Sequence, residues 1–146
     1  MQEHFYSMDK EDIIARFMYD KPLFPKRDVS CMCRLDYDRN MAVLALAGEI
    51  GFEKVVGIGV SFYQPATNTA EVAFSVLRQW QGKRIASVII RKLIPEAIKR
   101  GTDGFMAYTL PNNRRMIRLF EALPYKVKKF TQEGILVLSC SFRNMA

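Results

Sequence analysis

One stretch, residues 71–92, constrains the fold more than any other part of this sequence. An apolar, strand-like run ends at Leu77, a basic turn containing Gly82 follows, and apolar residues recur at helical spacing from Ile85. A strand that enters a short turn and leaves it as a long helix directs free backbone N–H groups and a helix N-terminus at one point. The stretch therefore predicts an anion site, and we expect the pyrophosphate of a nucleotide-bearing cofactor to bind there.

The length of 146 residues corresponds to one domain, 1–146, that can bury a core without metal or disulfide support. Apolar residues make up 49% of the chain and charged residues 25%, which is an ordinary globular composition. No apolar run approaches the roughly 20 residues that span a bilayer, and the N-terminus lacks a signal-peptide pattern. We therefore predict a cytoplasmic protein with no membrane partner.

The net charge of +7 suits nucleic acid, an anionic membrane surface or a polyanionic small molecule. Several basic residues flank the turn, namely Arg78, Lys83, Arg84, Arg91 and Lys92. This placement favours a phosphorylated ligand, and the chain has no RNA-reading strand motif. We therefore predict no nucleic-acid partner. The net charge alone supports nucleic-acid binding as a third class of function, and this function would show a DNA affinity that falls steeply with salt concentration.

The cysteines do not form a convincing metal site. A single residue separates Cys31 from Cys33, which is too tight for the usual zinc spacing, and His4 and Cys140 lie far away in the sequence. We expect idle thiols and no metal.

The order of predicted elements gives a mixed α/β domain. Strands are predicted at 41–47, 55–63 and 70–77, after two helices at 7–20 and from Asp28 onwards. A long helix from residue 85 to a cap at Gly101, a strand at 105–110, a helix opening at Pro111 and a hairpin of 125–131 with 135–142 complete the chain. The strand–helix–strand unit at 71–110 implies a parallel pair with a right-handed crossover within an otherwise antiparallel pattern.

This element order, together with Gln81-Gly82-Lys83-Arg84-Ile85-Ala86 and Pro111-Asn112-Asn113, resembles the GNAT acyltransferase superfamily. The family motif is Gln or Arg, two residues, Gly, one residue, then Gly or Ala. Gln81 and Ala86 fit this motif, and Arg84 replaces its first Gly. The resemblance implies a mixed, mostly antiparallel sheet with a splayed parallel pair and flanking helices, whose first strand would precede Met1.

Further sequence segments, such as Glu71-Val72-Ala73-Phe74 and Trp80-Gln81-Gly82-Lys83, are similar to one branch of that family. In this branch the GNAT domain is joined to acyl-CoA synthetase-like modules or to acetyl-CoA hydrolase/CoA-transferase modules. The resemblance therefore implies the C-terminal part of a longer chain whose other domains are partners.

The resemblance implies transfer of an acetyl group from acetyl-CoA to an amine, either a protein lysine or a small amine. It assigns Glu71 as the base, with a solvated or ion-paired strand carboxylate as the alternative. Asn113 matches a family Asn that contacts the cofactor, with a helix cap as the alternative. The other residues implied to bind coenzyme A are Phe74, Val76, Gln81, Gly82, Lys83, Arg84, Ile85, Ala86 and Ser87.

Two positions depart from the family pattern. Phe120 occupies the place of a Tyr that protonates the leaving thiolate in many members. Either another group or water supplies the proton, with Tyr108 and Tyr125 as distant candidates, or the thiolate leaves unassisted because of its low pKa. Arg84 either crowds a phosphate or reaches it as a cation. These departures support an alternative function, a non-catalytic acyl-CoA-binding regulatory module of a larger enzyme.

Overall fold

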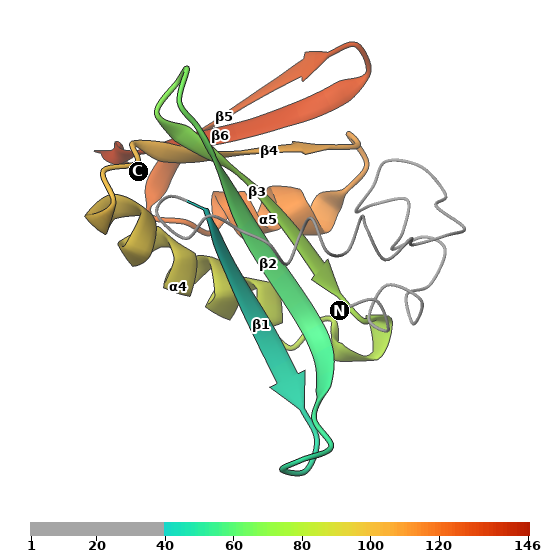
Figure 1. The fold of residues 1–146 in the computed structure, drawn as a ribbon. Helices are drawn as coiled ribbons and strands as arrows, with labels where there is room; N and C mark the ends of the chain where they lie inside the picture. Colours follow the sequence, from blue (N-terminus) through green and yellow to red (C-terminus); the bar gives the residue numbers. More distant parts are fainter. Residues whose placement is uncertain (1–39) are drawn as a thin grey trace.

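The computed structural model describes residues 40–146 as one six-stranded sheet with two α-helices and a 3-10 turn (Figure 1). The helices predicted at 7–20 and from Asp28, together with His4, Cys31 and Cys33, lie outside these residues. The elements in chain order are β1 (Met41–Ala47), β2 (Lys54–Gln64), β3 (Thr69–Val76), η1 (Arg78–Trp80), α4 (Ile85–Lys99), β4 (Gly104–Thr109), α5 (Arg114–Glu121), β5 (Tyr125–Gln132) and β6 (Ile135–Met145).

The sheet has the strand order β1-β2-β3-β4-β6-β5. The β3–β4 pair is parallel and the other four neighbouring pairs are antiparallel. The prediction of a mixed, mostly antiparallel sheet is therefore confirmed, and β1 has the predicted bounds. The final hairpin differs in detail, because Gln132 belongs to β5 and β6 runs past Phe142 to Met145.

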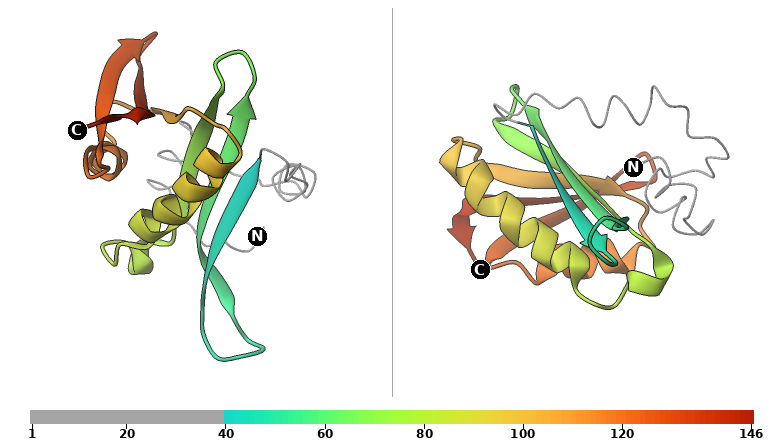
Figure 2. Two further views of the ribbon diagram at one scale, coloured as in Figure 1. Left: turned by 90° about the vertical axis from the view of Figure 1, so that its left-hand side faces the viewer. Right: turned by 60° about the horizontal axis from the view of Figure 1, so that its bottom comes forward.

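Helices α4 and α5 lie on the same face of the sheet and share one core (Figure 2). The centre of this core includes Ile89, Ile90 and Leu93 of α4 together with Phe120 of α5, all 2% exposed or less. Alternate residues of β3, Ala70 and Val72, point into the same core. The intervening side chains of β3 therefore point to the opposite face.

Two glycines let α4 approach the sheet closely. A Cβ atom at Gly59 would lie 2.2 Å from Cγ2 of Ile89, and one at Gly57 would lie 2.8 Å from Cγ2 of Ile85. Because neither distance is compatible with a side chain, the first turns of α4 rest directly on the backbone of β2. This contact fixes the position of the N-terminus of α4 relative to the sheet.

The parallel pair is short and opens toward the C-terminal ends of its strands. Pairing begins at Thr69 with Gly104 and ends at Glu71 with Met106. Beyond that point β3 continues to Val76 and β4 to Thr109 without pairing to each other. The predicted splayed pair is therefore confirmed, and it creates an opening in the sheet.

Candidate functional site

A cleft of about 870 Å³ occupies the opening between β3 and β4. It forms there because the strands separate and because α4 and α5 both begin beside the gap. The described residues that line it come from β3, the following turn, α4, β4 and α5: Glu71, Val72, Ala73, Phe74, Ser75, Val76, Trp80, Gln81, Gly82, Arg84, Ile85, Ala86, Ser87, Arg91, Tyr108, Asn113, Arg115, Met116, Arg118, Leu119 and Ala122.

The turn between β3 and α4 has an unusual backbone. The N–H of Trp80 donates to the carbonyl of Leu77 at 2.8 Å, which closes the 3-10 turn. Gly82 then has a φ of 76° and Arg84, the N-cap of α4, has a φ of 62°. Arg84 thus occupies the left-handed conformation that favours glycine, which gives a physical reason for the Gly of the family motif at this position.

The turn contains a run of backbone donors that have no acceptor in the described part of the chain. Within residues 40–146, no acceptor is hydrogen-bonded to the backbone N–H groups of residues 82–87. The first helical bond is donated by the N–H of Val88 to the carbonyl of Arg84 at 3.0 Å. A Cβ atom at Gly82 would meet no atom within 4 Å, so the backbone there is open. The geometry thus supplies the donors and the helix terminus that the predicted anion site needs.

Gln81 connects the end of β3 with α5. Its side-chain Nε2 donates to the carbonyl of Val76 at 3.0 Å, and its Oε1 accepts a hydrogen bond from Nη1 of Arg115. Both polar ends of this side chain are therefore used between protein elements. In the structure Gln81 holds the two walls of the cleft together, and its predicted contact with a cofactor stays a prediction.

Asn113 is a helix cap in the structure. Its Oδ1 accepts from the N–H of Met116 at 3.2 Å, and its Nδ2 donates to Oγ1 of Thr109 at 2.8 Å. These bonds satisfy one free donor of α5 and tie the helix to the end of β4. Asn113 also lines the cleft, so its cap role does not remove it from the site.

The other predicted binding residues divide into two groups. The side chains or backbones of Phe74, Val76, Ile85, Ala86 and Ser87 line the cleft, as do Gly82 and Arg84. Lys83 is not among the described lining residues.

The ammonium nitrogen of Lys83 instead lies 5.9 Å from the ring centroid of Trp80, in a cation–π arrangement. The turn therefore directs this side chain over an aromatic ring. A role for Lys83 in the predicted site would come through its backbone N–H, which belongs to the free run.

The positive charge of the cleft comes from more arginines than the turn motif indicates. Arg84, Arg91, Arg115 and Arg118 all line the cleft, against one described carboxylate, Glu71. Arg91 follows Arg84 by two helical turns, and this spacing places both on one side of α4. Arg118 belongs to a basic helix face visible in the sequence, but only the packing of α5 shows which of its residues reach the cleft.

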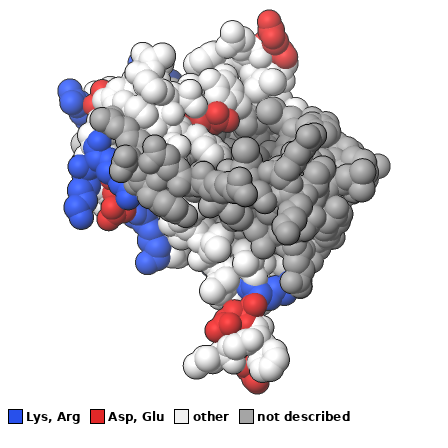
Figure 3. All heavy atoms as spheres, in the orientation of Figure 1, with Lys and Arg blue, Asp and Glu red and all other residues white. Residues whose placement is uncertain are grey.

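Lys and Arg side chains, with some Asp and Glu among them, gather along the side of the molecule where α4 runs, and further Asp and Glu side chains lie at the tip of the β1–β2 hairpin (Figure 3). The preference of the cleft for an anionic ligand therefore comes from the arginines that line it.

Glu71 lies at the last paired position of the parallel strands. It is half-buried, and its side chain is on the sheet face opposite α4, because its neighbours Ala70 and Val72 enter the helix-side core. In the described part of the chain, no Lys or Arg forms an ion pair with its carboxylate. The ion-paired alternative therefore finds no partner within residues 40–146, and Glu71 is one of the residues that line the cleft.

Phe120 lies in the core, outside the cleft. It is 0% exposed and is absent from the described cleft lining. A hydroxyl group on this ring would therefore enter the core of this chain. Of the two alternative tyrosines, Tyr125 packs edge-on against Phe142 with ring centroids 5.4 Å apart, whereas Tyr108 lines the cleft.

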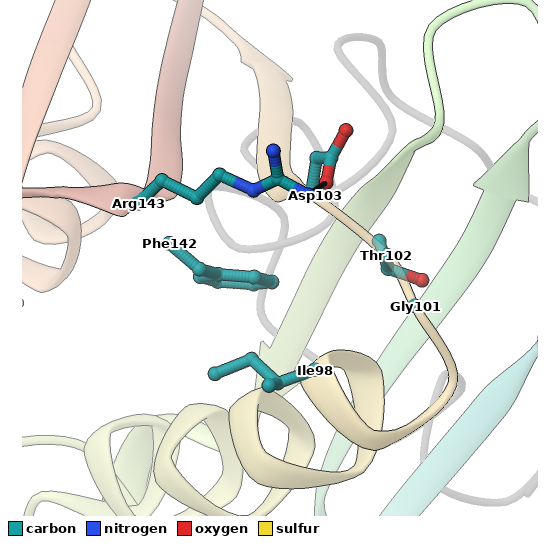
Figure 4. Close-up of a pocket in the computed structure, with 6 residues that line it drawn as sticks. All are labelled: Ile98, Gly101, Thr102, Asp103, Phe142 and Arg143. Carbon is teal, nitrogen blue, oxygen red and sulfur yellow. Dashed lines mark ion pairs between the residues drawn. The ribbon is translucent and has the colours of Figure 1, made fainter.

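A second hollow of about 180 Å³ lies at the C-terminal end of α4 (Figure 4). Its wall includes Ile98 and Phe142, and Arg143 forms an ion pair with Asp103 at 3.2 Å on its rim. This hollow contains no residue of the predicted site.

Within residues 40–146, no group of three or more His, Cys, Asp or Glu side chains could hold a metal ion, and no helix is long and apolar enough to span a bilayer. Cys140 is a buried free thiol, and burial raises its pKa.

The comparisons with known proteins agree with this geometry. Residues 8–124 match the family model described as the Acetyltransferase (GNAT) family. The GNAT domain of S. lividans PAT has a TM-score of 0.81 at 24% identity, covering 97% of this chain and 84% of that chain. A domain from Methanocaldococcus jannaschii has a TM-score of 0.75 at 19% identity, covering 96% of this chain and 90% of that chain.

A further solved structure, yncA from Salmonella typhimurium with its cofactor acetyl-CoA, has a TM-score of 0.74 at 18% identity, covering 99% of this chain and 88% of that chain. At these identities the solved structures show the fold. The family model spans well over half of the sequence, and the chain therefore belongs to the GNAT acetyltransferase family.

Proposed function

We propose that this chain is an N-acetyltransferase that transfers an acetyl group from acetyl-CoA directly to an amine, with Glu71 as the base. The observation that carries the proposal is the run of N–H groups at residues 82–87, which have no acceptor within residues 40–146 and which, except for that of Lys83, belong to residues lining the same cleft as Glu71. An anion site and a carboxylate at opposite parts of one cleft match a ligand that joins a pyrophosphate to a reactive thioester. Family membership supports acetyl transfer in general.

The residues of the turn fit the phosphates of coenzyme A. Six consecutive N–H donors and the N-terminus of α4 favour negative charge, and the guanidinium groups of Arg84 and Arg91 line the same wall. Arg115 and Arg118 of α5 line the opposite wall. In this arrangement backbone donors fix the pyrophosphate, and the arginines add attraction at longer range.

The edge of β3 fits the amide-rich arm of the same ligand. After Glu71, the side of β3 that faces β4 has no strand partner among the described residues. An extended amide chain pairs with such an edge in the manner of an added strand. The direction of β3, from Glu71 to Val76, then leads from the carboxylate toward the phosphate site.

When bound, acetyl-CoA supplies a thioester whose carbonyl carbon is open to attack by an amine. The chain must remove a proton from the amine, because an ammonium nitrogen has no free electron pair. Glu71 accepts that proton, either directly or through a water molecule, and the lack of an ion pair from a Lys or Arg of residues 40–146 to its carboxylate supports this role. No described cysteine lines the cleft, which favours direct transfer over a covalent acyl-enzyme.

One observation favours the second candidate function, a non-catalytic acyl-CoA-binding module within a longer chain. Arg84 places a large side chain at a left-handed position beside the anion site, where a glycine would leave more room. This candidate shares the ligand but not the reaction. It predicts binding of acetyl-CoA without amine-dependent release of the thiol.

The test compares the wild type with Glu71→Gln in acetyl-CoA turnover with lysine peptides and small amines. Glu71→Gln keeps the size of the side chain and removes its basicity, so kcat should fall by about 100-fold or more while acetyl-CoA affinity stays unchanged. Glu49→Gln, on the exposed β1–β2 loop, is the matched control and should retain full activity. A Glu71→Gln variant as active as the control would refute Glu71 as the base.

A further inference from the structure

The structure assigns a second residue to this reaction: we propose that Tyr108 gives its hydroxyl proton to the sulfur of the departing thiolate. The inference rests on the proposed function, because it concerns the same cleft. Phe120, which occupies the place of the family's proton-donating Tyr, has no hydroxyl group that could protonate the thiolate. Three features support this role: the register of β3 with β4, the direction of the Tyr108 side chain, and the poorer placement of the other described donors.

The register places Tyr108 on the same sheet face as Glu71. Glu71 pairs with Met106 in parallel register, and paired residues of neighbouring strands point to the same face. Tyr108 follows Met106 by two residues and so shares its face. The base and the phenol therefore belong to opposite sides of the gap, on one face of the sheet.

The side chain of Tyr108 turns back toward the level of Glu71. Its hydroxyl group lies 3.9 Å from the sulfur of Met106, the register partner of Glu71. Oγ1 of Thr69 lies 3.7 Å from the same sulfur, from the β3 side. A thioether is a weak acceptor, so the hydroxyl proton of Tyr108 remains available to a stronger acceptor such as a thiolate.

The gap provides room for the reacting groups beside Tyr108. Pairing stops at Glu71 and Met106, so the β3 residue at the level of Tyr108 is Ala73, whose side chain is small. Tyr108 is 41% exposed and lines the cleft. Its backbone is held on the other side by pairing with Val137 of β6, which keeps the phenol on a rigid strand.

Other candidate donors in the described residues are less well placed. Tyr125 packs against Phe142, and Cys140 is buried away from the cleft. Ser75 is 4% exposed and already takes part in a polar contact. Ser87 belongs to the run of donors at the proposed phosphate site. Tyr108 is therefore the proton donor that shares the carboxylate's face of the gap.

The proton balance closes with these two residues. The nitrogen of a protonated amine loses two protons on becoming an amide, and Glu71 takes them in turn, one before and one after the C–N bond forms. The C–S bond breaks with its electron pair remaining on sulfur, and Tyr108 gives that sulfur a proton. Solvent then returns a proton to the phenolate and accepts those from Glu71, so one proton is released overall.

The experiment uses Tyr108→Phe, which keeps the ring and removes the hydroxyl, with Tyr125→Phe as the matched control. Turnover of acetyl-CoA should fall by about 100-fold in Tyr108→Phe and stay at the wild-type rate in Tyr125→Phe. The second readout is calorimetric binding of coenzyme A and of desulfo-coenzyme A at pH 9. A hydrogen bond from Tyr108 to a thiolate predicts that the wild type prefers coenzyme A by roughly tenfold, a preference that Tyr108→Phe should lose.

The outcomes separate the two proposals. An active wild type with an equally active Tyr108→Phe variant would overturn the role of Tyr108 and leave the proposed function intact. Lost turnover with the coenzyme A preference retained would show a structural role and overturn the proton-donor role as well. A wild type that binds acetyl-CoA but turns over no acceptor would refute the proposed function, and the role of Tyr108 with it.

Discussion

Replacing Arg84 with glycine separates the backbone of the turn from the charge of its side chain. Arg84 has φ 62° and ψ 25°, a conformation that costs a non-glycine residue about 1 kcal/mol or more. Glycine relieves this strain but adds about 0.4–1 kcal/mol of chain entropy to the unfolded state. The two effects oppose each other, so the free energy of unfolding of Arg84→Gly should change by less than about 1 kcal/mol.

Binding of coenzyme A should change more than stability. Arg84 is exposed and lines the cleft beside the free N–H run, so its interaction with a phosphate is partly screened by water. We take the contribution at the low end for a charged hydrogen bond, about 1.5 kcal/mol. Because 1.4 kcal/mol is a factor of ten in an equilibrium constant, Arg84→Gly should weaken coenzyme A binding by roughly tenfold.

Calorimetric titration with coenzyme A gives this factor, and Arg84→Asn provides the control. Asparagine tolerates the left-handed conformation and has no charge, so it should weaken binding as much as glycine does. Salt should reduce the difference between the wild type and both variants. Tighter binding of coenzyme A by Arg84→Gly than by the wild type would contradict a favourable phosphate contact, because it would show that the side chain crowds the phosphates.

Two further predictions concern stability. Gly59→Ala should destabilise the fold by about 1–3 kcal/mol in urea unfolding, because the new Cβ would lie 2.2 Å from Cγ2 of Ile89. The double variant Gly59→Ala with Ile89→Ala should lose less stability than the sum of the losses in the two single variants. Strictly additive losses would argue against a clash between the two side chains. Asn113→Ala should lose about 1 kcal/mol, since Oδ1 caps the N–H of Met116. Asn113→Asp, which keeps an acceptor there, should recover most of that stability, and equal losses in both variants would contradict the capping role.

The sequence patterns predict the order and type of the described elements well. The continuous apolar run bounded by Asn40 and Gly48 predicts a strand with the bounds of β1. The apolar spacing after Ile85 and the cap at Gly101 predict α4, because local periodicity and capping depend on neighbouring residues alone. The sequence shows Gly57 and Gly59 of β2 at alternate positions. Their close contact with α4, however, involves residues distant in the sequence and could not be predicted from the local pattern.

The side-chain directions within the site could not be predicted in the same way. The motif indicates that Gln81 and Asn113 belong to the site, but their hydrogen bonds to Val76, Arg115 and Thr109 join separate elements. A one-dimensional pattern contains no information on which face of α5 meets the core. The burial of Phe120 and the exposure of Arg118 to the cleft therefore emerge only from the packing.

The charge of Arg84 could be read directly from the sequence, whereas its left-handed backbone could not. The pattern leaves open whether a side chain there crowds a ligand or contacts it, because both depend on the φ angle and on the direction of the side chain. A φ of 62° favours glycine, which gives a physical reason for the Gly of the family motif at this position.

In the proposed function, one cleft both binds acetyl-CoA and transfers its acetyl group. The most direct test measures thiol release from saturating acetyl-CoA by the wild-type protein, with and without an amine acceptor from a panel of lysine peptides and small amines. We expect amine-dependent release at a rate that far exceeds the rate without acceptor. Saturable acetyl-CoA binding with equal release in the presence and absence of every amine would contradict it and would favour a binding module.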